Sequence, residues 1–467
     1  MTESLSRRLL LRRLGYAGLG TAAGAVGFNA VAPAVFPERT SFDPNRGYWS
    51  RALPPALPPL GEDLDVDVAV IGGGYTGLSA AWYLMRAAPG ARVAVLEAAR
   101  CGNGASARNG GMVLNLQMPL AAPLARRLYE LTRDNITRLG ALAGEHGIDC
   151  DLEQHGALAV LRTDADLRAA QPAFTTLASA GVPLQSWNRE RTRAALGTDA
   201  YVGAICDPGA GQVHPGKLVR LWQTAAAAAG ARVFEGSPVV RIEAGRSHRL
   251  VTAAGHAVRA AHLVLATNAW TSKLGFLRRA VAPIANYVGI TAPLDAPRLA
   301  ALGWASRMPF SDSRREVYYA GCTPDGRVHF GGGPVDYQFN NGVAPPAGAA
   351  ARWRDLHREF ARVFPQLADV PFEATWYGWV DVSLDERPAV GRLGPYGNIY
   401  YGLGYSGEGV NLTSVFGRII ADLVAGRAAD WKWFPLLDRL PPYIPNEPFR
   451  WLAIEGDIAL SRWTQGS

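Results

Sequence analysis

Apolar and polar positions alternate with two different periods along the chain, and the clearest succession lies in its first quarter. A run of strand length and β-branched character covers Val66–Ile71, and a glycine turn follows at residues 72–77. Apolar residues then recur with helical spacing over Leu78–Arg86, before a second run of buried-strand type at Arg92–Leu96. This order predicts a strand–turn–helix–strand unit with two parallel strands.

The glycine turn has the chemistry of a dinucleotide-binding loop. Gly72 allows the tight turn, Gly74 lets the backbone approach a pyrophosphate, and Gly77 lets the helix pack closely on the strand. The amides and positive dipole at the helix N-terminus then favour phosphate. Glu97 directly follows the second strand, where a carboxylate accepts the ribose hydroxyls of an adenosine. A glycine turn without a ligand is the alternative. The predicted contacts are Gly72, Gly74, Tyr75, Thr76, Gly77, Glu97 and Ala98.

A second loop, residues 101–111, decides between the common dinucleotides. It reads CGNGASARNGG and is rich in glycine and hydrogen-bond donors. A nicotinamide enzyme does not need such a loop straight after the acidic residue, whereas a cofactor with a long diphosphate and a flavin ring does. We therefore predict FAD and disfavour an NAD-dependent dehydrogenase. The loop's predicted cofactor contacts are Ser106, Arg108, Asn109, Gly110 and Gly111.

The two periods continue through the rest of the chain. Helices are predicted at 119–146, 164–180, from the segment 212–217 to 229, and at 411–424. Strands are predicted at 157–162, 232–235, 237–242, 261–266, 317–319, 327–330 and 399–402. The turn Pro324-Asp325-Gly326 lies between two of these strands. Thr267 and Asn268 follow the strand 261–266, at the carboxyl edge of the sheet, where cofactors bind.

Four motifs, in order, carry a family resemblance. They are GGGYTGLSAAWYL, LEAARCGNGASARNGG, LVLATNAWTSKL and GLGYSGEGVNLTSVFGRIIADLVAG. Together they resemble the D-amino-acid-oxidase-type FAD-dependent oxidoreductases, and within them γ-glutamylputrescine oxidase-like proteins, over about residues 64 to 430. The resemblance implies an α/β fold, in which a Rossmann-like FAD-binding domain carries an inserted mixed-sheet (α+β) substrate domain.

The pattern and the resemblance together give a domain organisation. A targeting segment, a Pro-rich linker and a C-terminal tail flank a FAD-binding domain that the substrate domain interrupts. The expected ranges are 1–35 for the targeting segment, 36–63 for the linker, 64–150, 201–279 and 377–430 for the FAD-binding domain, 151–200 for a mixed or substrate-domain part, 280–376 for the substrate domain and 431–467 for the tail.

The resemblance also implies further cofactor contacts. Backbone near Val239 is expected to contact the adenine, and the glycine turn before the helix at 411 is expected to face the flavin pyrimidine. A helix N-terminus there stabilises the negative charge that builds on reduction. His214, a tempting base, would lie far from the flavin, so a helix cap is favoured. The contacts expected from these segments are Val239, Thr267, Asn268, Gly404, Tyr405, Ser406, Gly407, Gly409 and Val410.

The substrate side is less specific. Many relatives have an arginine shortly after the paired tyrosines that holds a substrate carboxylate, but this chain reads Tyr319-Ala320-Gly321-Cys322. That departure favours an amine over an α-amino acid, although Arg315 could substitute. Trp376 and Trp379 could wall the cavity above the flavin or be ordinary core. Glu408 could attract a cationic amine or cap the helix. The candidate catalytic residues are Tyr319, Trp376, Trp379 and Glu408.

Charge and composition mainly affect the question of location. The formal net charge is +7 with only three lysines, and no basic stripe is interleaved with aromatics, so a nucleic-acid partner is not expected. Ser6–Arg12 resembles a twin-arginine export motif, followed by a Gly- and Ala-rich apolar stretch. We expect export by that route or a membrane anchor, with cytoplasmic location less favoured. The four cysteines have no metal spacing, and no metal is predicted.

These observations predict an FAD-dependent amine or amino-acid oxidase or dehydrogenase. A hydride would leave the carbon bearing nitrogen for flavin N5, and water would hydrolyse the imine. The small-molecule amine is one partner, and oxygen or a membrane quinone is the other. The scarcity of lysine and the export segment favour a membrane-linked dehydrogenase or deaminase. A flavin-binding accessory or assembly protein without turnover is the alternative from another class.

Overall fold

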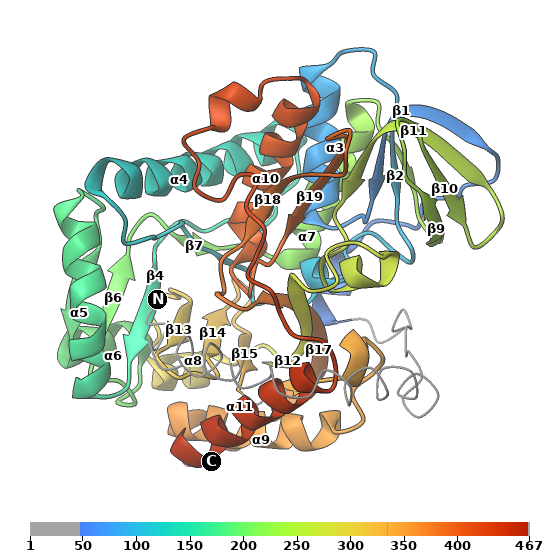
Figure 1. Cartoon of the computed structure of the whole chain (residues 1–467). Helices are drawn as coiled ribbons and strands as arrows, with labels where there is room; N and C mark the ends of the chain where they lie inside the picture. The colour runs from blue at the N-terminus through green and yellow to red at the C-terminus, as the bar shows by residue number, and fades with distance from the viewer. Residues whose placement is uncertain (1–46, 334, 466–467) are drawn as a thin grey trace.

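The computed structural model describes residues 47–333 and 335–465, with side chains to residue 461 (Figure 1). The expected targeting segment and the first part of the linker lie outside the described residues. The remainder of the linker is an ordered strap on the surface. It begins with the short helix η2 (Tyr48–Ala52) and continues as an extended segment. Its Leu57 N donates to Glu235 Oε2 at 2.9 Å, and its Leu60 N donates to Ser237 Oγ at 2.9 Å.

The first sheet has eight strands and carries the predicted strand–turn–helix–strand unit. Its main path runs β18-β19-β11-β1-β2-β8, and β10 and β9 extend from β11 as an antiparallel arm. The central strands are parallel, and β1 is buried along most of its length, as expected for a strand covered on both faces. The strands are β1 (Leu64–Ile71), β2 (Val93–Leu96), β8 (Arg232–Phe234), β9 (Val239–Glu243), β10 (His248–Thr252), β11 (Ala257–Leu265), β18 (Ala389–Leu393) and β19 (Ile399–Leu403).

Three helices pack against this sheet and share a hydrophobic core with it. They are α3 (Tyr75–Ala87), α7 (Pro215–Ala228) and α10 (Gly409–Val424). The helix α10 is buried on nearly every face and packs closely on α3. A Cβ on Gly417 would lie 2.2 Å from Ser79 Oγ, so the two backbones approach at a position that only glycine allows. His214 caps α7, as favoured from the sequence, because its Nδ1 accepts a hydrogen bond from Lys217 N at 3.2 Å.

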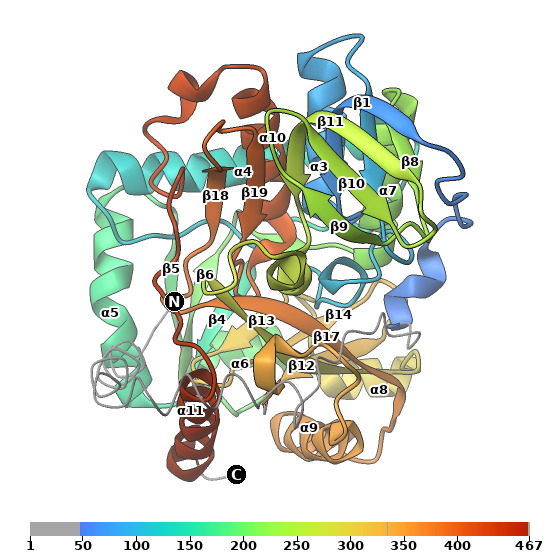
Figure 2. The same cartoon turned by 45° about the vertical axis from the view of Figure 1, so that its right-hand side comes forward.

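The second sheet has nine strands and is mixed, which confirms the expected α/β fold with a second, mixed sheet (Figure 2). Its path runs β16-β12-β15-β14-β13-β4-β6-β5, and β17 pairs with β12. The predicted hairpin around Pro324-Asp325-Gly326 is the β14–β15 pair. The strands are β4 (Ala157–Leu161), β5 (Gln185–Asn188), β6 (Gly203–Asp207), β12 (Val281–Thr291), β13 (Phe310–Asp312), β14 (Tyr318–Cys322), β15 (Val328–Gly332), β16 (Asp336–Tyr337) and β17 (Phe372–Ser383). A small third sheet pairs β3 (Met112–Val113) with β7 (Gly211–Gln212).

One expected boundary falls inside a strand of the second sheet, and another lies just before a strand of that sheet. The strand β17 pairs with β12 from Phe372 to Ser383, so a division at residue 376 cuts a continuous strand. The strand β6 also belongs to this sheet, although the sequence placed residues 201–279 in the FAD-binding domain. Both strands pair only within the second sheet, and alternation within a strand does not show which sheet it joins.

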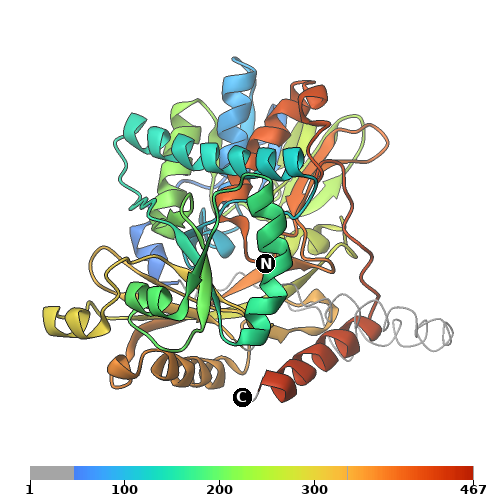
Figure 3. The same ribbon diagram turned by 90° about the vertical axis from the view of Figure 1, so that its left-hand side faces the viewer.

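Helices cover the outer surfaces of the second sheet, and one of them is formed by the C-terminal tail (Figure 3). In the described part of the chain, no helix is long and apolar enough to cross a membrane. All four cysteines are buried thiols outside any disulfide. These covering helices are α5 (Asp164–Ser179), α6 (Arg189–Leu196), α8 (Ala296–Leu302), α9 (Ala349–Val363) and α11 (Phe449–Gln465), whereas α4 (Ala122–Glu145) packs on α10 and α7.

Candidate cofactor and substrate site

The glycine turn between β1 and α3 has the geometry that the sequence predicted. Gly72 has φ +106°, and a Cβ there would lie 2.4 Å from the carbonyl oxygen of Ala266. A Cβ on Gly77 would lie 1.9 Å from the carbonyl oxygen of Gly72. The turn is therefore closed tightly against both β11 and its own helix, and the N-terminus of α3 lies at the carboxyl edge of the sheet.

Glu97 lies where β2 ends, beside this turn. Its Oε2 accepts a hydrogen bond from Gly73 N at 2.7 Å, and its Oε1 accepts one from Ala99 N at 2.9 Å. Burial raises the pKa of its carboxyl, and these backbone donors oppose the rise. The segment before Val239 pairs with the same region, because Ser237 N donates to the carbonyl oxygen of Glu97 at 2.8 Å. The expected ribose and adenine contacts of Glu97, Ala98 and Val239 are thus neighbours in space.

The second donor loop holds itself in place with its own polar side chains. Ser106 Oγ accepts from Tyr75 N at 3.0 Å, which ties the loop to the start of α3. Asn109 Nδ2 donates to the carbonyl oxygen of Ser106 at 2.8 Å, and its Oδ1 accepts from Gly111 N at 2.7 Å. Arg108 is buried and donates from Nη1 to the carbonyl oxygen of Tyr377 at 2.9 Å. The guanidinium of Arg108 therefore fastens the loop to β17.

The turn before α10 is held by a buried carboxylate that the sequence did not single out. Asp381 Oδ2 accepts from Gly404 N at 2.6 Å, and its backbone oxygen accepts from Ser406 N at 3.1 Å. Burial raises the pKa of this carboxyl to about 7. Asn268 reaches the same strand, since its Oδ1 accepts from Asp381 N at 3.0 Å. The predicted contacts at Asn268 and at residues 404–410 are therefore assembled around Asp381.

These residues fit FAD. Two glycine turns, each opening a helix and the first closed tightly, point their N-terminal amides at the carboxyl edge of one parallel sheet. A carboxylate stands at the end of β2, and a donor-rich loop lies between the two turns. An extended dinucleotide with a flavin ring needs this set of groups. In the described residues, no group of histidine, cysteine, aspartate and glutamate side chains could hold a metal ion.

A cavity of about 1880 Å³ extends from the flavin end of this site to the second sheet. The donor loop and the turn before α10 form its inner end, through Arg108, Asn109, Gly110 and residues 406–408. Strands β12 and β14 contribute the opposite wall. An apolar arm reaches α5, where Ala173, Phe174 and Leu177 line it, and α11 closes another side. The volume exceeds that of an ordinary small-ligand pocket, so a flavin ring and a substrate can share it.

Tyr319 lines the cavity, as expected for a residue on the substrate side. Its hydroxyl donates to Asn286 Oδ1 at 3.3 Å, and burial raises the pKa of the phenol. A Cβ on Gly110 would lie 2.5 Å from its ring, and a Cβ on Gly331 would lie 2.4 Å away. Behind it, burial lowers the pKa of His329 to about 4. The ring of Tyr319 therefore lies against two glycines that leave no room for a side chain.

Trp376 and Trp379 do not line the cavity, and the expectation that they wall it is corrected. Along β17 the cavity is lined by Gly378, Val380 and Val382. Trp379 points to the other face of the sheet and is buried there in the hydrophobic core. Trp376 is fully buried under η2, and its Nε1 donates to the carbonyl oxygen of Arg108 at 2.9 Å. Strand alternation puts one indole away from the cavity, and the donor loop covers the other.

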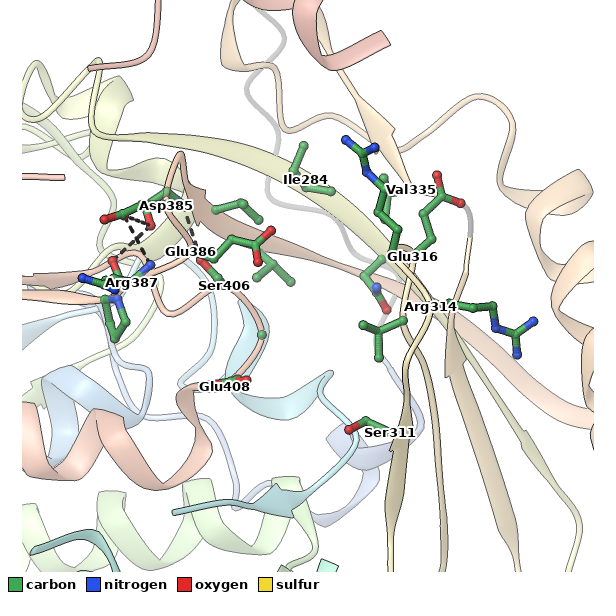
Figure 4. Close-up of a pocket in the computed structure, with 18 of the residues that line it drawn as sticks. Ile284, Ser311, Arg314, Glu316, Val335, Asp385, Glu386, Arg387, Ser406 and Glu408 are labelled. Atoms are coloured by element: carbon green, nitrogen blue, oxygen red, sulfur yellow. Dashed lines mark hydrogen bonds between the residues drawn. The ribbon is translucent and has the colours of Figure 1, made fainter. Parts of the chain in front are cut away.

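Carboxylates gather at the inner end of the cavity. Figure 4 shows Glu386 and Glu408 on one side and Ser311 and Glu316 on the side opposite. Burial raises the pKa of the Glu408 carboxyl, and the charge of Glu386 raises it further. Glu386 has φ +56° in the tight turn between β17 and β18, and Ser406 has φ +50° in the facing turn. Non-glycine residues held in this conformation often mark functional sites.

The two arginines on the opposite wall are both paired. Arg314 forms ion pairs with Asp312 and Glu359. Arg315, the candidate stand-in for a carboxylate-binding arginine, forms an ion pair with Asp457 of α11. No sequence signal pointed to this partner, because the two positions are more than 140 residues apart and no motif links them. For the same reason, the sequence analysis did not identify Asp381, Glu386 and Asn286 as site residues.

This architecture defines a class of protein: a two-sheet dinucleotide-dependent flavoprotein with its substrate cavity between the sheets. The model of the family described as "FAD dependent oxidoreductase" (DAO) matches residues 67–423. The chain belongs to this family, whose members depend on FAD.

Relatives and solved structures agree with the family match. The chain is 31% identical over 427 residues to "Probable oxidoreductase OrdL" of Rhizobium meliloti, covering 88% of this chain and 95% of that protein. It is 32% identical over 400 residues to "Gamma-glutamylputrescine oxidoreductase" of Escherichia coli, covering 82% of this chain and 89% of that protein. The crystal structure of glycine oxidase from Geobacillus kaustophilus has the same fold, with a TM-score of 0.68 at 24% identity over 80% of this chain and 99% of that one.

Proposed function

We propose that this protein oxidises the C–N bond of a small amine whose additional positive charge is recognised by Glu408 and Glu386. One observation carries the proposal: the inner end of the cavity presents carboxylates, while the arginines of the opposite wall are already paired. Carboxylates bind ammonium groups by charge-assisted hydrogen bonds. A cationic amine therefore suits this cavity better than a carboxylate anion does.

The chain's own residues supply orientation and exclude water. Bound FAD supplies the acceptor for the hydride that leaves the carbon bearing nitrogen. Tyr319 and Val288 give that carbon a flat, apolar wall, and Glu408 holds a positive charge of the substrate at a fixed distance from the α10 turn. Holding the reacting carbon in place accounts for much of the rate enhancement in such a reaction. Water admitted through the cavity hydrolyses the released imine.

Two relatives support the substrate class. The Escherichia coli relative is named for γ-glutamylputrescine, and the Geobacillus kaustophilus relative, 26% identical over 370 residues, is named for glycine. The compound in each name carries a primary amine. The carboxylate-lined inner wall favours the first kind of substrate, because the terminal amine of its putrescine part lies on an extended chain, away from the carboxylate of the glutamyl group.

Anaerobic mixing tests the proposal. The purified, FAD-loaded protein is mixed with polyamines, γ-glutamylated amines, N-methyl amino acids and D- or L-amino acids, and the visible absorbance of the flavin is followed. Bleaching is expected with the amines whose reacting carbon carries no carboxylate, which are the polyamines and the γ-glutamylated amines. Bleaching by amino acids alone would overturn the substrate class. If the protein is yellow and folded but no compound of the panel bleaches its flavin, the proposed oxidation is wrong and an accessory role is favoured. Admitting air or a soluble quinone to the bleached protein then identifies the acceptor.

We also propose that the chain is exported by the twin-arginine route. The support is the motif at Ser6–Arg12 and the apolar stretch after it. Replacing Arg7 and Arg8 by lysine should retain the full-length protein in the cytoplasm of a host with this pathway, with flavin still bound. Fractionation with a flavin-fluorescence readout measures this, and an unchanged distribution would contradict export.

A further inference from the structure

The ion pair between Arg315 and Asp457 forms part of the cavity wall. Arg315 lies between β13 and β14, and Asp457 lies in the C-terminal helix α11. Both residues line the cavity, and their side chains keep exposures of only 13% and 11%. An arginine so placed is a ready receptor for a carboxylate, because its planar guanidinium binds two oxygens at once. Here the carboxylate comes from the protein itself.

The helix that carries Asp457 is fixed independently of this pair. Glu447, just before α11, accepts a hydrogen bond from the hydroxyl of Tyr337 and another from Asn340 N at 3.0 Å. Arg450 Nε donates to the carbonyl oxygen of Pro445 at 2.9 Å. Ile458 is buried beside Asp457 and also lines the cavity. The start of α11 is therefore anchored on the second sheet, and Asp457 reaches Arg315 from an already placed helix.

We propose that Asp457 occupies the position of a substrate carboxylate on Arg315, so that the pair makes the cavity select against amines that carry a carboxylate on the reacting carbon. The inference rests on the proposed function, and it names the residues that exclude amino acids. Arg314 has no such role, since its guanidinium is held by Asp312 and Glu359 together. With Arg315 paired to Asp457, an incoming carboxylate finds this guanidinium already occupied.

The test removes the internal carboxylate and measures whether an external one takes its place. FAD-loaded wild-type protein and the Asp457→Asn variant are titrated by calorimetry with sodium benzoate and with benzamide, its uncharged analogue. Benzoate should bind the variant at least about tenfold more tightly than the wild type, the effect of one charge-assisted contact. Benzamide should bind both proteins equally. Asp457→Glu, which keeps a carboxylate, should behave as the wild type.

Two further variants separate selectivity from a loosened helix. Adding Arg315→Gln to Asp457→Asn should abolish the gain in benzoate affinity. Ile458→Ala removes a buried contact of the same turn and leaves the ion pair, so it should give no gain. A missing gain, a gain that survives without Arg315, or the same gain in Ile458→Ala would each overturn the proposal. If circular dichroism shows that Asp457→Asn is unfolded, Asp457→Ser is titrated in its place.

The binding measurement needs no turnover, so it fails or succeeds independently of the proposed function. Reduction of the wild-type flavin by amines tests the reaction, whereas benzoate affinity tests the pair. A second readout joins them: N-methylglycine should bleach the flavin of Asp457→Asn under anaerobic conditions at least tenfold faster than that of the wild type. An unchanged rate together with tighter benzoate binding would overturn the claim that the pair selects substrates.

Discussion

The side-chain oxygens of Thr76 and Tyr405 lie 2.8 Å apart and share a hydrogen bond. Thr76 belongs to the first turn of α3, and Tyr405 belongs to the turn that leads into α10. Both side chains are buried. This bond joins two cofactor-facing turns that are far apart in the sequence, and it fixes the distance between the two helix N-termini, which are expected to face the pyrophosphate and the flavin pyrimidine of FAD.

Removing either hydroxyl should destabilise the protein. Thr76→Val and Tyr405→Phe each leave the other oxygen buried without its partner, at a cost of about 1–3 kcal/mol. The double variant should be less destabilised than the sum of the two, because no unpaired hydroxyl remains. Urea unfolding of the four proteins measures this coupling. Additive effects would show that the bond does not link the two turns.

Gly77→Ala should yield a protein without flavin. The new Cβ would lie 1.9 Å from the carbonyl oxygen of Gly72, so the turn must open or the helix must move. Either change displaces the amides that would hold the pyrophosphate, and overpacking alone costs about 1–3 kcal/mol. The ratio of absorbance at the flavin band to that of the protein reports occupancy after purification.

A matched control for this change is Gly144→Ala in α4. No atom lies within 4 Å of the Cβ it would add, and the position is exposed. Alanine should stabilise the helix by up to about 1 kcal/mol and leave flavin content unchanged. Full flavin content in Gly77→Ala would show that the turn tolerates a side chain.

The carboxyl of Asp381 should make stability depend on pH. Its pKa of about 7 in the folded protein lies above the usual value near 4, because the buried site disfavours the charged form. The contribution of Asp381 to the free energy of unfolding is therefore largest at pH values below about 4 and is lost as the pH rises toward 7. Three pKa units correspond to at most about 4 kcal/mol. Asp381→Asn removes this titration, so its melting temperature relative to the wild type should rise between pH 5 and pH 8.

The test compares how the melting temperatures of the two proteins change with pH, and not the constant difference between them. Asparagine keeps an oxygen for Gly404 N, and any constant cost of the replacement shifts the variant's curve equally at every pH. Thermal unfolding of both FAD-loaded proteins across this range measures the difference. Parallel curves would mean that Asp381 is ionised at pH 5 in the folded state.

Local patterns in the sequence predicted the FAD-binding half well. The turn at Gly72–Gly77, Glu97 and the helix cap at His214 all depend on neighbouring residues, and the structure has them where they were expected. The glycine turn before α10 likewise lies at the carboxyl edge of the sheet. In each case the chemistry is carried by backbone and by short loops, and such signals are readable within one segment.

The substrate side was harder because it depends on contacts between distant segments. Trp376 and Trp379 have the composition of a cavity wall, but only the pairing of β17 with β12 shows which face each indole occupies. Asp381 and Glu386 lie in one segment with several acidic residues, and the sequence does not distinguish the buried one from the cavity-facing one. The partner of Arg315 is in a tail that was expected only to pack back or to make an external contact.

Neutralising the inner carboxylates should weaken binding of a cationic amine. Glu408→Gln keeps the shape of the side chain and removes its charge, so KM for the best amine should rise about tenfold, the effect of one charge-assisted contact. Glu386→Gln should act in the same direction, and the double variant should raise KM further, while kcat changes less in each case.

Because the pKa of Glu408 is raised, binding in the wild type should weaken as the pH falls through that pKa, and Glu408→Gln should flatten this dependence. Glu130→Gln, an exposed residue of α4 paired with Arg126, is the control and should leave KM unchanged. An unchanged KM in the double variant, measured by initial rates of flavin reduction, would show that these carboxylates do not contact the substrate.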